Sequence, residues 1–246
     1  MNFDFITRHV NDGVLERDFL LGDVTGILWT PTSASAASPV PLILLGHPGR
    51  LQAMRSRLSA RARRAAADGY ATATIELPWT GDRPPSLATE HARADLRAAL
   101  AAGRPVPPDV VDRLILPLVE ASVPEWQEAM DAALALPEIG GPVAYSGGII
   151  SIGVRLAASD PRIVAAGLFA GSFVPAAILD EARHVTIPLH VLLQWDDEGN
   201  DRQMALELFD AFGSPEKTLH ANMGGHTGVP AFAGEDAAHF FARHLR

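Results

Sequence analysis

The chain contains no cysteine among its 246 residues. That absence excludes disulfide bonds, zinc sites built on thiolates and a cysteine nucleophile. No apolar run reaches the ~18 residues that a membrane-spanning helix requires. The first residues, MNFDFITRHVNDG, carry acidic side chains and no apolar core, so they do not resemble a secretory signal. We therefore expect a soluble, cytoplasmic protein with no membrane partner.

Basic side chains are also scarce relative to acidic ones. The chain has 20 Lys and Arg residues against 29 Asp and Glu residues, a formal net charge of −9. Proteins that bind nucleic acid present a basic face, so this balance argues against such a partner. Hydrophobic residues make up 48% of the chain, enough for a sizeable core. The length suits one large α/β domain or two small ones.

Short apolar runs alternate with helical patterns along most of the chain. Residues 14–31 alternate loosely and indicate a hairpin of two strands. Further runs that indicate strands are 40–49, 71–78, 141–147, 162–171, 187–197 and 216–224. Helical patterns follow at 51–70, 149–160, 201–213 and 231–245. Strands that alternate with helices predict an α/β protein with a mostly parallel central sheet flanked by helices.

The alternation is interrupted between about Thr80 and Ile139. Three segments there have helical patterns: 89–103, 107–122 and 123–136. Pro124 stands at the start of the third, a position where its missing N–H does little harm. We interpret the first two, about 84–122, as a small helical cap inserted after the fourth strand. The third is then the crossover that returns to the sheet of a single domain, 1–246.

Chemically useful segments follow four of the predicted strands. In open parallel sheets, ligands bind beyond the carboxyl ends of the strands. The segments are GHPGR, YSGG, QWDDEGN and MGGHTG. They supply a turn with free N–H groups, a serine, a carboxylate and a histidine. The chain order Ser, Asp, His is the one that α/β-hydrolases use.

These features resemble the α/β-hydrolase superfamily, in particular its dienelactone-hydrolase-like and small carboxylesterase members with a serine nucleophile. The resemblance extends from about residue 14 to 245 and is strongest in LILLGHPG, AYSGG, LLQWDDEG and GGHTG. It implies an α/β-hydrolase fold and a Ser-His-Asp triad for acyl transfer, without metal or organic cofactor. Dienelactone hydrolases themselves use a cysteine nucleophile, which this chain lacks.

Ser146 is the candidate nucleophile. The stretch PVAYSGGIIS is close to the G-x-S-x-G elbow, with Ala144 in place of the first glycine and Gly148 as the second. An elbow holds its serine in a strained turn between strand and helix. The alternatives are an ordinary turn serine, a decayed elbow without a nucleophile, or a register on Ser151, which Ile149 at the position two before it disfavours.

His226 and Asp197 are the candidate base and acid. A glycine-flanked loop after the last strand leaves the His226 ring free to face a hydroxyl on one side and a carboxylate on the other. The family pattern places the acid three residues beyond a strand-ending position, here Gln194, which selects Asp197. Asp196 is the alternative acid, or caps the turn. His47 is expected to support the turn after its strand.

An oxyanion hole requires two N–H groups. Gly147 is expected to give one. The turn HPGR is expected to give the other, and because Pro48 has no N–H, we favour Gly49 over Arg50. We therefore expect a serine hydrolase that cleaves a small-molecule carboxylic ester or lactone through an acyl-enzyme. C–C hydrolysis, acyl transfer and a catalytically altered or inactive binding protein are the alternatives, and the sequence leaves a homodimer open.

Overall fold

The computed structural model of the chain describes residues 1–171 and 173–245. Its centre is one ten-stranded sheet. The strands are β1 (Asp4–Phe5), β2 (His9–Asn11), β3 (Val14–Leu21), β4 (Val24–Pro31), β5 (Val40–Gly46), β6 (Ala71–Ile75), β7 (Ile139–Gly147), β8 (Ile163–Phe169), β9 (Leu189–Gln194) and β10 (Lys217–Asn222). Their order in space is β1-β3-β4-β6-β5-β7-β8-β9-β10, with β2 also paired to β3.

Six of these strands form a parallel sheet, from β6 through β5, β7, β8 and β9 to β10. The predicted hairpin, β3 and β4, joins this sheet through an antiparallel pair of β4 with β6. The expected mostly parallel sheet is thus confirmed. The strands β1 and β2 were not predicted, because two or three residues are too few to show a period.

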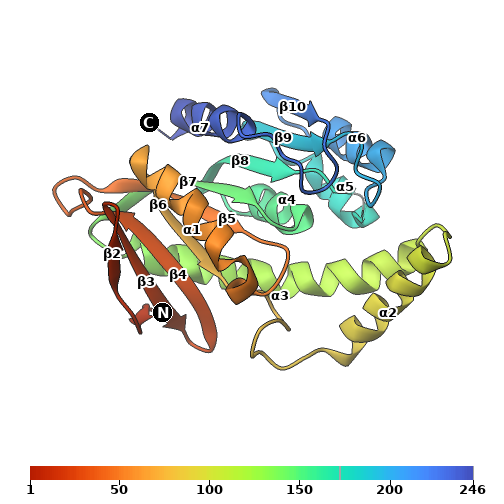
Figure 1. Ribbon diagram of the computed structural model, residues 1–246, viewed down its shortest axis with the longest axis horizontal. Helices are drawn as coiled ribbons and strands as arrows, with labels where there is room; N and C mark the ends of the chain where they lie inside the picture. Colours follow the sequence, from red (N-terminus) through yellow and green to blue (C-terminus); the bar gives the residue numbers. More distant parts are fainter. Residues whose placement is uncertain (172, 246) are drawn as a thin grey trace.

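Helices cover both faces of the sheet (Figure 1). They are α1 (Leu51–Ala67), α2 (Leu87–Ala101), α3 (Pro108–Leu134), α4 (Ile150–Ser159), α5 (Ala176–Ala182), α6 (Arg202–Ala211) and α7 (Ala233–His244). One apolar cluster joins the sheet to α1 and α7, and the other joins it to α3, α4, α5 and α6. The short α5 was not predicted. No helix in the described part of the chain combines the length and apolar character needed to cross a membrane.

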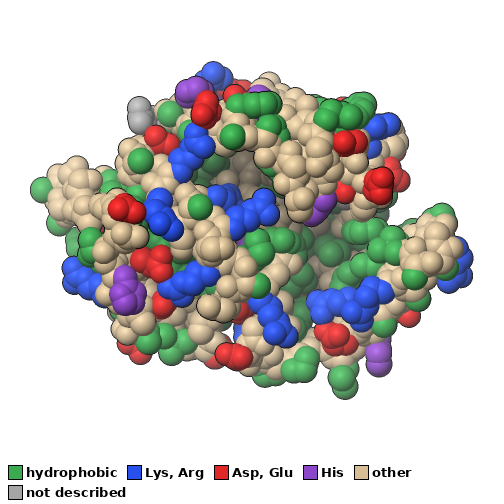
Figure 2. Space-filling model, viewed as in Figure 1, with side chains coloured by type: hydrophobic (Ala, Val, Ile, Leu, Met, Phe, Trp, Pro, Cys, Tyr) green, Lys and Arg blue, Asp and Glu red, His purple; other side chains and the backbone are tan. Residues whose placement is uncertain are grey.

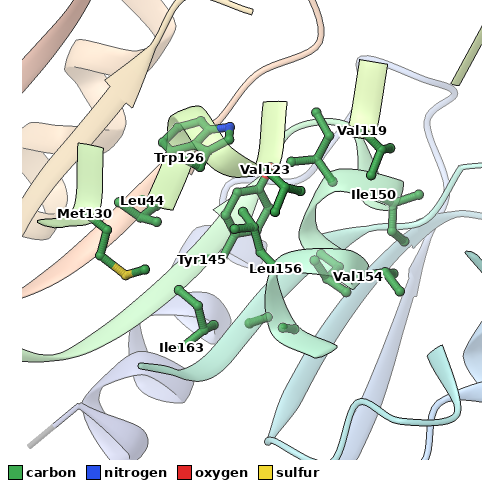
Figure 3. Close-up of a cluster of buried hydrophobic side chains, with 14 of the residues drawn as sticks. Leu44, Val119, Val123, Trp126, Met130, Tyr145, Ile150, Val154, Leu156 and Ile163 are labelled. Carbon is green, nitrogen blue, oxygen red and sulfur yellow. The ribbon is translucent and has the colours of Figure 1, made fainter. Parts of the chain in front are cut away.

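The predicted boundary between helices 107–122 and 123–136 is wrong, because α3 is one helix of 27 residues. Pro117 and Pro124 both lie inside it. Each proline removes one backbone hydrogen bond, but an apolar stripe continues past both. Figure 3 shows Val119, Val123 and Trp126 of that stripe gathered around sheet residues such as Tyr145. Burial of this stripe, which contains the fully buried Trp126, holds the helix together.

The segment expected to form a cap contains α2 and the first half of α3. These two helices pack against each other. In Figure 1 their connection projects from the body of the molecule, whereas the second half of α3 lies along the sheet. Large apolar side chains at both ends of α2, Leu87 and Leu100, are exposed. That residues 84–122 roof a pocket stays a prediction.

His190 of β9 is a titratable group in the layer between the sheet and α7. It is 5% exposed. Its ring centroid lies 4.4 Å from that of His220 and 5.6 Å from that of Phe240. Burial, and to a lesser degree the charge of His220, lowers the pKa of His190 to about 4, although Asp236 opposes this effect. The folded protein therefore keeps His190 neutral.

This burial predicts a specific loss of stability in acid. An unfolded histidine takes up its proton near pH ~6.5, whereas folded His190 does so near 4. The stabilisation is thus complete above about pH 6.5 and lost as the pH falls from there toward about 4. At about pH 4.5, wild type should have lost about 2 kcal/mol more unfolding free energy, relative to neutral pH, than His190→Leu has.

Urea unfolding at several pH values measures this difference. His239→Gln, at an exposed position of α7, is the control and should follow wild type. Equal acid losses in wild type and His190→Leu would show that the buried imidazole does not cause them.

Candidate active site

The candidate residues gather where the parallel strands end. Because β5, β7, β8, β9 and β10 run in the same direction, their carboxyl ends lie along one edge of the sheet. The molecular surface is hollowed between α1 and the region before α7, and basic side chains border the hollow (Figure 2).

Asp197 and His226 form a hydrogen-bonded pair at this edge. His226 Nδ1 donates to Asp197 Oδ2 at 2.7 Å. The Asp197 side chain is 3% exposed and the His226 side chain 70% exposed. Asp197 Oδ1 also accepts from the N–H of Gly199 at 3.0 Å. The rings of Phe169 and His226 pack in a T-shaped arrangement with their centroids 5.8 Å apart. With Nδ1–H directed at a carboxylate, the neutral ring has its lone pair on Nε2, facing outward.

The neighbouring aspartate holds the histidine loop instead of the histidine ring. Asp196 Oδ1 accepts from the N–H groups of Gly224 at 2.8 Å and Gly225 at 2.9 Å. These bonds, that from Gly225 first, lower the pKa of Asp196. Gln194 Nε2 donates to the Gly225 carbonyl at 2.7 Å, so both sides of the turn are fixed. Asp196 therefore caps the turn, which was the second of the two roles that the sequence allowed for it.

Ser146 lies in the last part of β7, in register with Leu45 and Gly167. Its hydroxyl oxygen accepts from Arg61 Nη2 at 2.8 Å, and its carbonyl from the same atom at 3.1 Å. No hydrogen bond within residues 1–171 and 173–245 joins Ser146 to His226. The structure therefore brings Asp197 and His226 together but leaves Ser146 with Arg61.

The turn expected at Ser146 falls on the next two residues. Gly147 has φ +82° and Gly148 φ +72°, whereas among described non-glycine residues only Asp12 and Trp79 have positive φ. Ser146 is therefore extended, and the strain expected of an elbow serine is absent from it. An extended strand alternates faces, so Ser146 shares the α1 and α7 face with Ala144, while Tyr145 packs against Trp126 of α3.

The other residues predicted from the sequence lie at the ends of β5 and β7 or directly after them. Ser151 is 0% exposed in the first turn of α4, so its hydroxyl does not reach a ligand. Gly147 pairs with Gly46 at the end of β5. Gly49 lies in the turn after β5, with open space on the side where a side chain would stand. His47 is buried, and its Nε2 donates to the Ile75 carbonyl at 2.9 Å.

Two residues of the site escaped sequence reasoning, Arg61 and Glu76. Arg61 is one of several arginines on α1, and nothing in the pattern distinguishes it. Both carboxylate oxygens of buried Glu76 accept from the Leu51 N–H at 3.1 Å, and Glu76 also accepts from Thr80. Glu76 thus caps α1 directly after the turn that contains Gly49. An acid at the end of the strand ATATI was the signal for it.

No group of three or more His, Asp or Glu side chains in the described ranges is arranged to hold a metal ion.

Comparison with solved structures shows that hydrolases share the fold of this chain. The chain matches no family model and no curated protein. Among solved structures, it is similar to a cold-adapted esterase from an Arctic intertidal metagenomic library, with a TM-score of 0.79 and 26% identity over 100% of both chains.

Two more distant structures share the fold. A dienelactone hydrolase from Anabaena variabilis has a TM-score of 0.59 and 19% identity, over 94% of this chain and 99% of that one. Acetyl xylan esterase 1 from Thermoanaerobacterium has a TM-score of 0.66 and 11% identity, over 98% and 87%. The predicted resemblance is confirmed over the whole chain. The chain has the α/β-hydrolase fold, and its similarity to esterases and to a dienelactone hydrolase supports a carboxylic ester hydrolase.

Proposed function

We propose that the protein is a carboxylic ester hydrolase that cleaves a small ester or lactone through an acyl-enzyme. The observation that carries the proposal is the 2.7 Å bond between buried Asp197 and exposed His226 at the carboxyl edge of the sheet. A base with its lone pair outward and its other nitrogen on a carboxylate is the arrangement that general-base catalysis requires. The similarity to an esterase over the full chain supports the same reaction.

In the proposed mechanism, Ser146 Oγ attacks the ester carbonyl while His226 Nε2 takes its proton. Asp197 stabilises the imidazolium that forms. The N–H groups of Gly147 and Gly49 hold the negative oxygen of the tetrahedral intermediate. His226 then gives the proton to the departing alkoxide, which leaves an acyl-serine. A water molecule, deprotonated by His226, releases the carboxylic acid and restores the serine.

The mechanism requires one change at Ser146. Its hydroxyl accepts a hydrogen bond from Arg61 at 2.8 Å, which leaves its O–H free to donate, but within the described residues it donates none to His226. Catalysis therefore includes a movement that brings the Ser146 hydroxyl within hydrogen-bond distance of His226 Nε2. Hydrogen bonds between catalytic groups commonly tighten only when substrate binds.

Ser146→Ala should abolish hydrolysis of chromogenic esters and labelling by a fluorophosphonate probe, because both reactions need the hydroxyl. Without the Ser146 hydroxyl, Asp197 and His226 remain but no nucleophile does, so kcat should fall on the order of 10³-fold or more. Circular dichroism confirms that the variant folds. Ser151→Ala is the matched control and should retain labelling. Loss of labelling in Ser151→Ala alone would assign the nucleophile to Ser151.

A second function has one observation in its favour. The positive φ angles of the β7–α4 turn belong to Gly147 and Gly148, and Ser146 is bound by Arg61. This arrangement favours, as the second candidate, a catalytically altered hydrolase fold that binds a ligand without cleaving it. Wild-type protein that neither labels nor hydrolyses any ester of a panel with rising acyl length would favour this second function.

The two adjacent aspartates should differ in how they affect catalysis. Asp197→Asn removes the charge that orients the imidazole and should lower kcat by on the order of 10⁴-fold. Asp196→Asn retains one acceptor oxygen for the glycine N–H groups and should have an effect of a few-fold. Asp196→Ala loses both bonds and should lower kcat about tenfold, because the histidine loop loosens.

Steady-state kinetics of the three folded variants on one chromogenic ester measures this order. If Asp196→Asn proved worse than Asp197→Asn, the orienting acid would be Asp196. Small and equal losses would mean that His226 works without a carboxylate.

A further inference from the structure

Among the described residues, the hydrogen-bond partners of Arg61 are all neutral. Its guanidinium donates to Ser146 Oγ at 2.8 Å, to the Ser146 carbonyl at 3.1 Å and to the Gly46 carbonyl at 3.4 Å. All three acceptors lie at the ends of β5 and β7, within the candidate active site. Arg61 therefore brings a positive charge into direct contact with the proposed nucleophile.

Other partly buried arginines in this protein have carboxylate partners. Arg17 pairs with Glu138 at 2.8 Å. Three further pairs of the same kind are Arg55–Glu16, Arg83–Glu125 and Arg155–Glu181. Arg61 takes part in no ion pair with any residue of the described ranges. A charge withdrawn from water is unfavourable unless an opposite charge pairs with it. The Arg61 guanidinium lacks the carboxylate partner that the other four arginines have.

The charges around Arg61 increase this imbalance. Arg57, one helical turn earlier on α1, is exposed and also forms no ion pair within the described ranges. Burial first, and then the charge of Arg57, lowers the pKa of Arg61 to about 10. The carboxylate partners of Arg83 and Arg155 raise the pKa of those groups instead. In a protein of net charge −9, two neighbouring arginines thus have no ion pair within the described ranges, and one of them contacts Ser146.

Gly147 leaves room for this guanidinium. A side chain on Gly147 would begin 3.0 Å from Arg61 Nη1. Because the glycine has none, Arg61 lies directly against the β7–α4 turn, beside the N–H proposed for the oxyanion hole. A ligand whose carbonyl group occupies that hole would therefore bring its adjoining atoms next to Arg61.

We propose that Arg61, assisted by Arg57 at the rim, binds an anionic group of the ligand, a carboxylate or a phosphate. A planar guanidinium binds either group through paired N–H donors. The substrate class that follows, an ester which itself carries an anionic group, rests on the proposed function. The anion would give Arg61 the charged acceptor that it lacks among the described residues.

Binding tests the site without reference to catalysis. Titration calorimetry with succinate, phosphate and the neutral analogue butyramide should show that at least one anion binds wild type while butyramide does not. Arg61→Met should weaken the anion by about 10- to 100-fold, the usual effect of losing a charge-assisted hydrogen bond. Arg61→Lys keeps the charge but not the paired N–H donors, so its affinity for the anion should lie between those of wild type and Arg61→Met. Arg57→Met should weaken binding a few-fold, and more at low salt.

Arg64→Met is the matched control, since Arg64 is on the same helix but pairs with Glu235 at 3.8 Å. It should bind as wild type does. Thermal unfolding of each variant identifies any that misfolds. If Arg61→Met misfolds, Arg57→Met at an exposed position provides the second test of the site. No anion binding by wild type, or equal binding by wild type, Arg61→Met and Arg57→Met, would overturn the proposal.

Kinetics adds the substrate class. The 4-nitrophenyl monoester of succinic acid should exceed 4-nitrophenyl butyrate in kcat/KM with wild type, and Arg61→Met should reduce that preference by about tenfold or more, mainly through KM. Succinate binding that depends on Arg61 without any ester hydrolysis would uphold the anion site and defeat the hydrolase. Hydrolysis of the butyrate that depends on Ser146, without anion binding, would do the reverse.

Discussion

The parallel pairing of β7 between β5 and β8 is the constraint on which the site depends. Its register sets Gly147 beside Gly46 and Ser146 beside Gly167. The fit at this level is close, because a side chain on Gly46 would begin 2.9 Å from the Cα of Gly148. The ends of three strands are therefore held level by backbone contact. Whatever the loops do, the turn after β7 and the turn after β5 remain neighbours.

The division of work between the two aspartates follows from the end of β9. Successive side chains that leave a strand point in different directions. Asp197 turns inward, where burial and the Gly199 N–H hold it against the His226 ring. Asp196 turns to the main chain of the glycine loop. One aspartate thus orients the imidazole, and the other holds the segment that carries it. Neither could be exchanged for the other without moving the loop.

Much of this architecture could be predicted from the sequence. The strands β5 to β10 are short apolar runs whose burial on both faces leaves a plain signal. The meeting of Asp197 with His226 follows from their places after neighbouring parallel strands. The helix boundary expected at Pro124 was wrong. Burial of the apolar stripe around Trp126 outweighs the backbone hydrogen bond that the proline removes.

The conformation of Ser146 and the role of Arg61 were beyond such reasoning. In the sequence YSGG, either glycine can adopt the positive φ of the turn, and the motif spacing does not determine which residue does so. Arg61 reaches the site from the middle of a helix rich in arginine, and only its position in space separates it from Arg64. Both features depend on tertiary contacts.

The loop that carries His226 is fixed through its main chain. Asp196 and Gln194 bind backbone atoms of Gly224 and Gly225, and a side chain on Gly228 would begin 1.9 Å from the Gly224 carbonyl oxygen. The side chains of Met223 and Thr227, on either side of this framework, are exposed. Mutation at those two positions can therefore change the surface beside His226 while His226 keeps its place. The loop offers a route by which selection, natural or in the laboratory, can alter the surroundings of His226 without rebuilding its contact with Asp197.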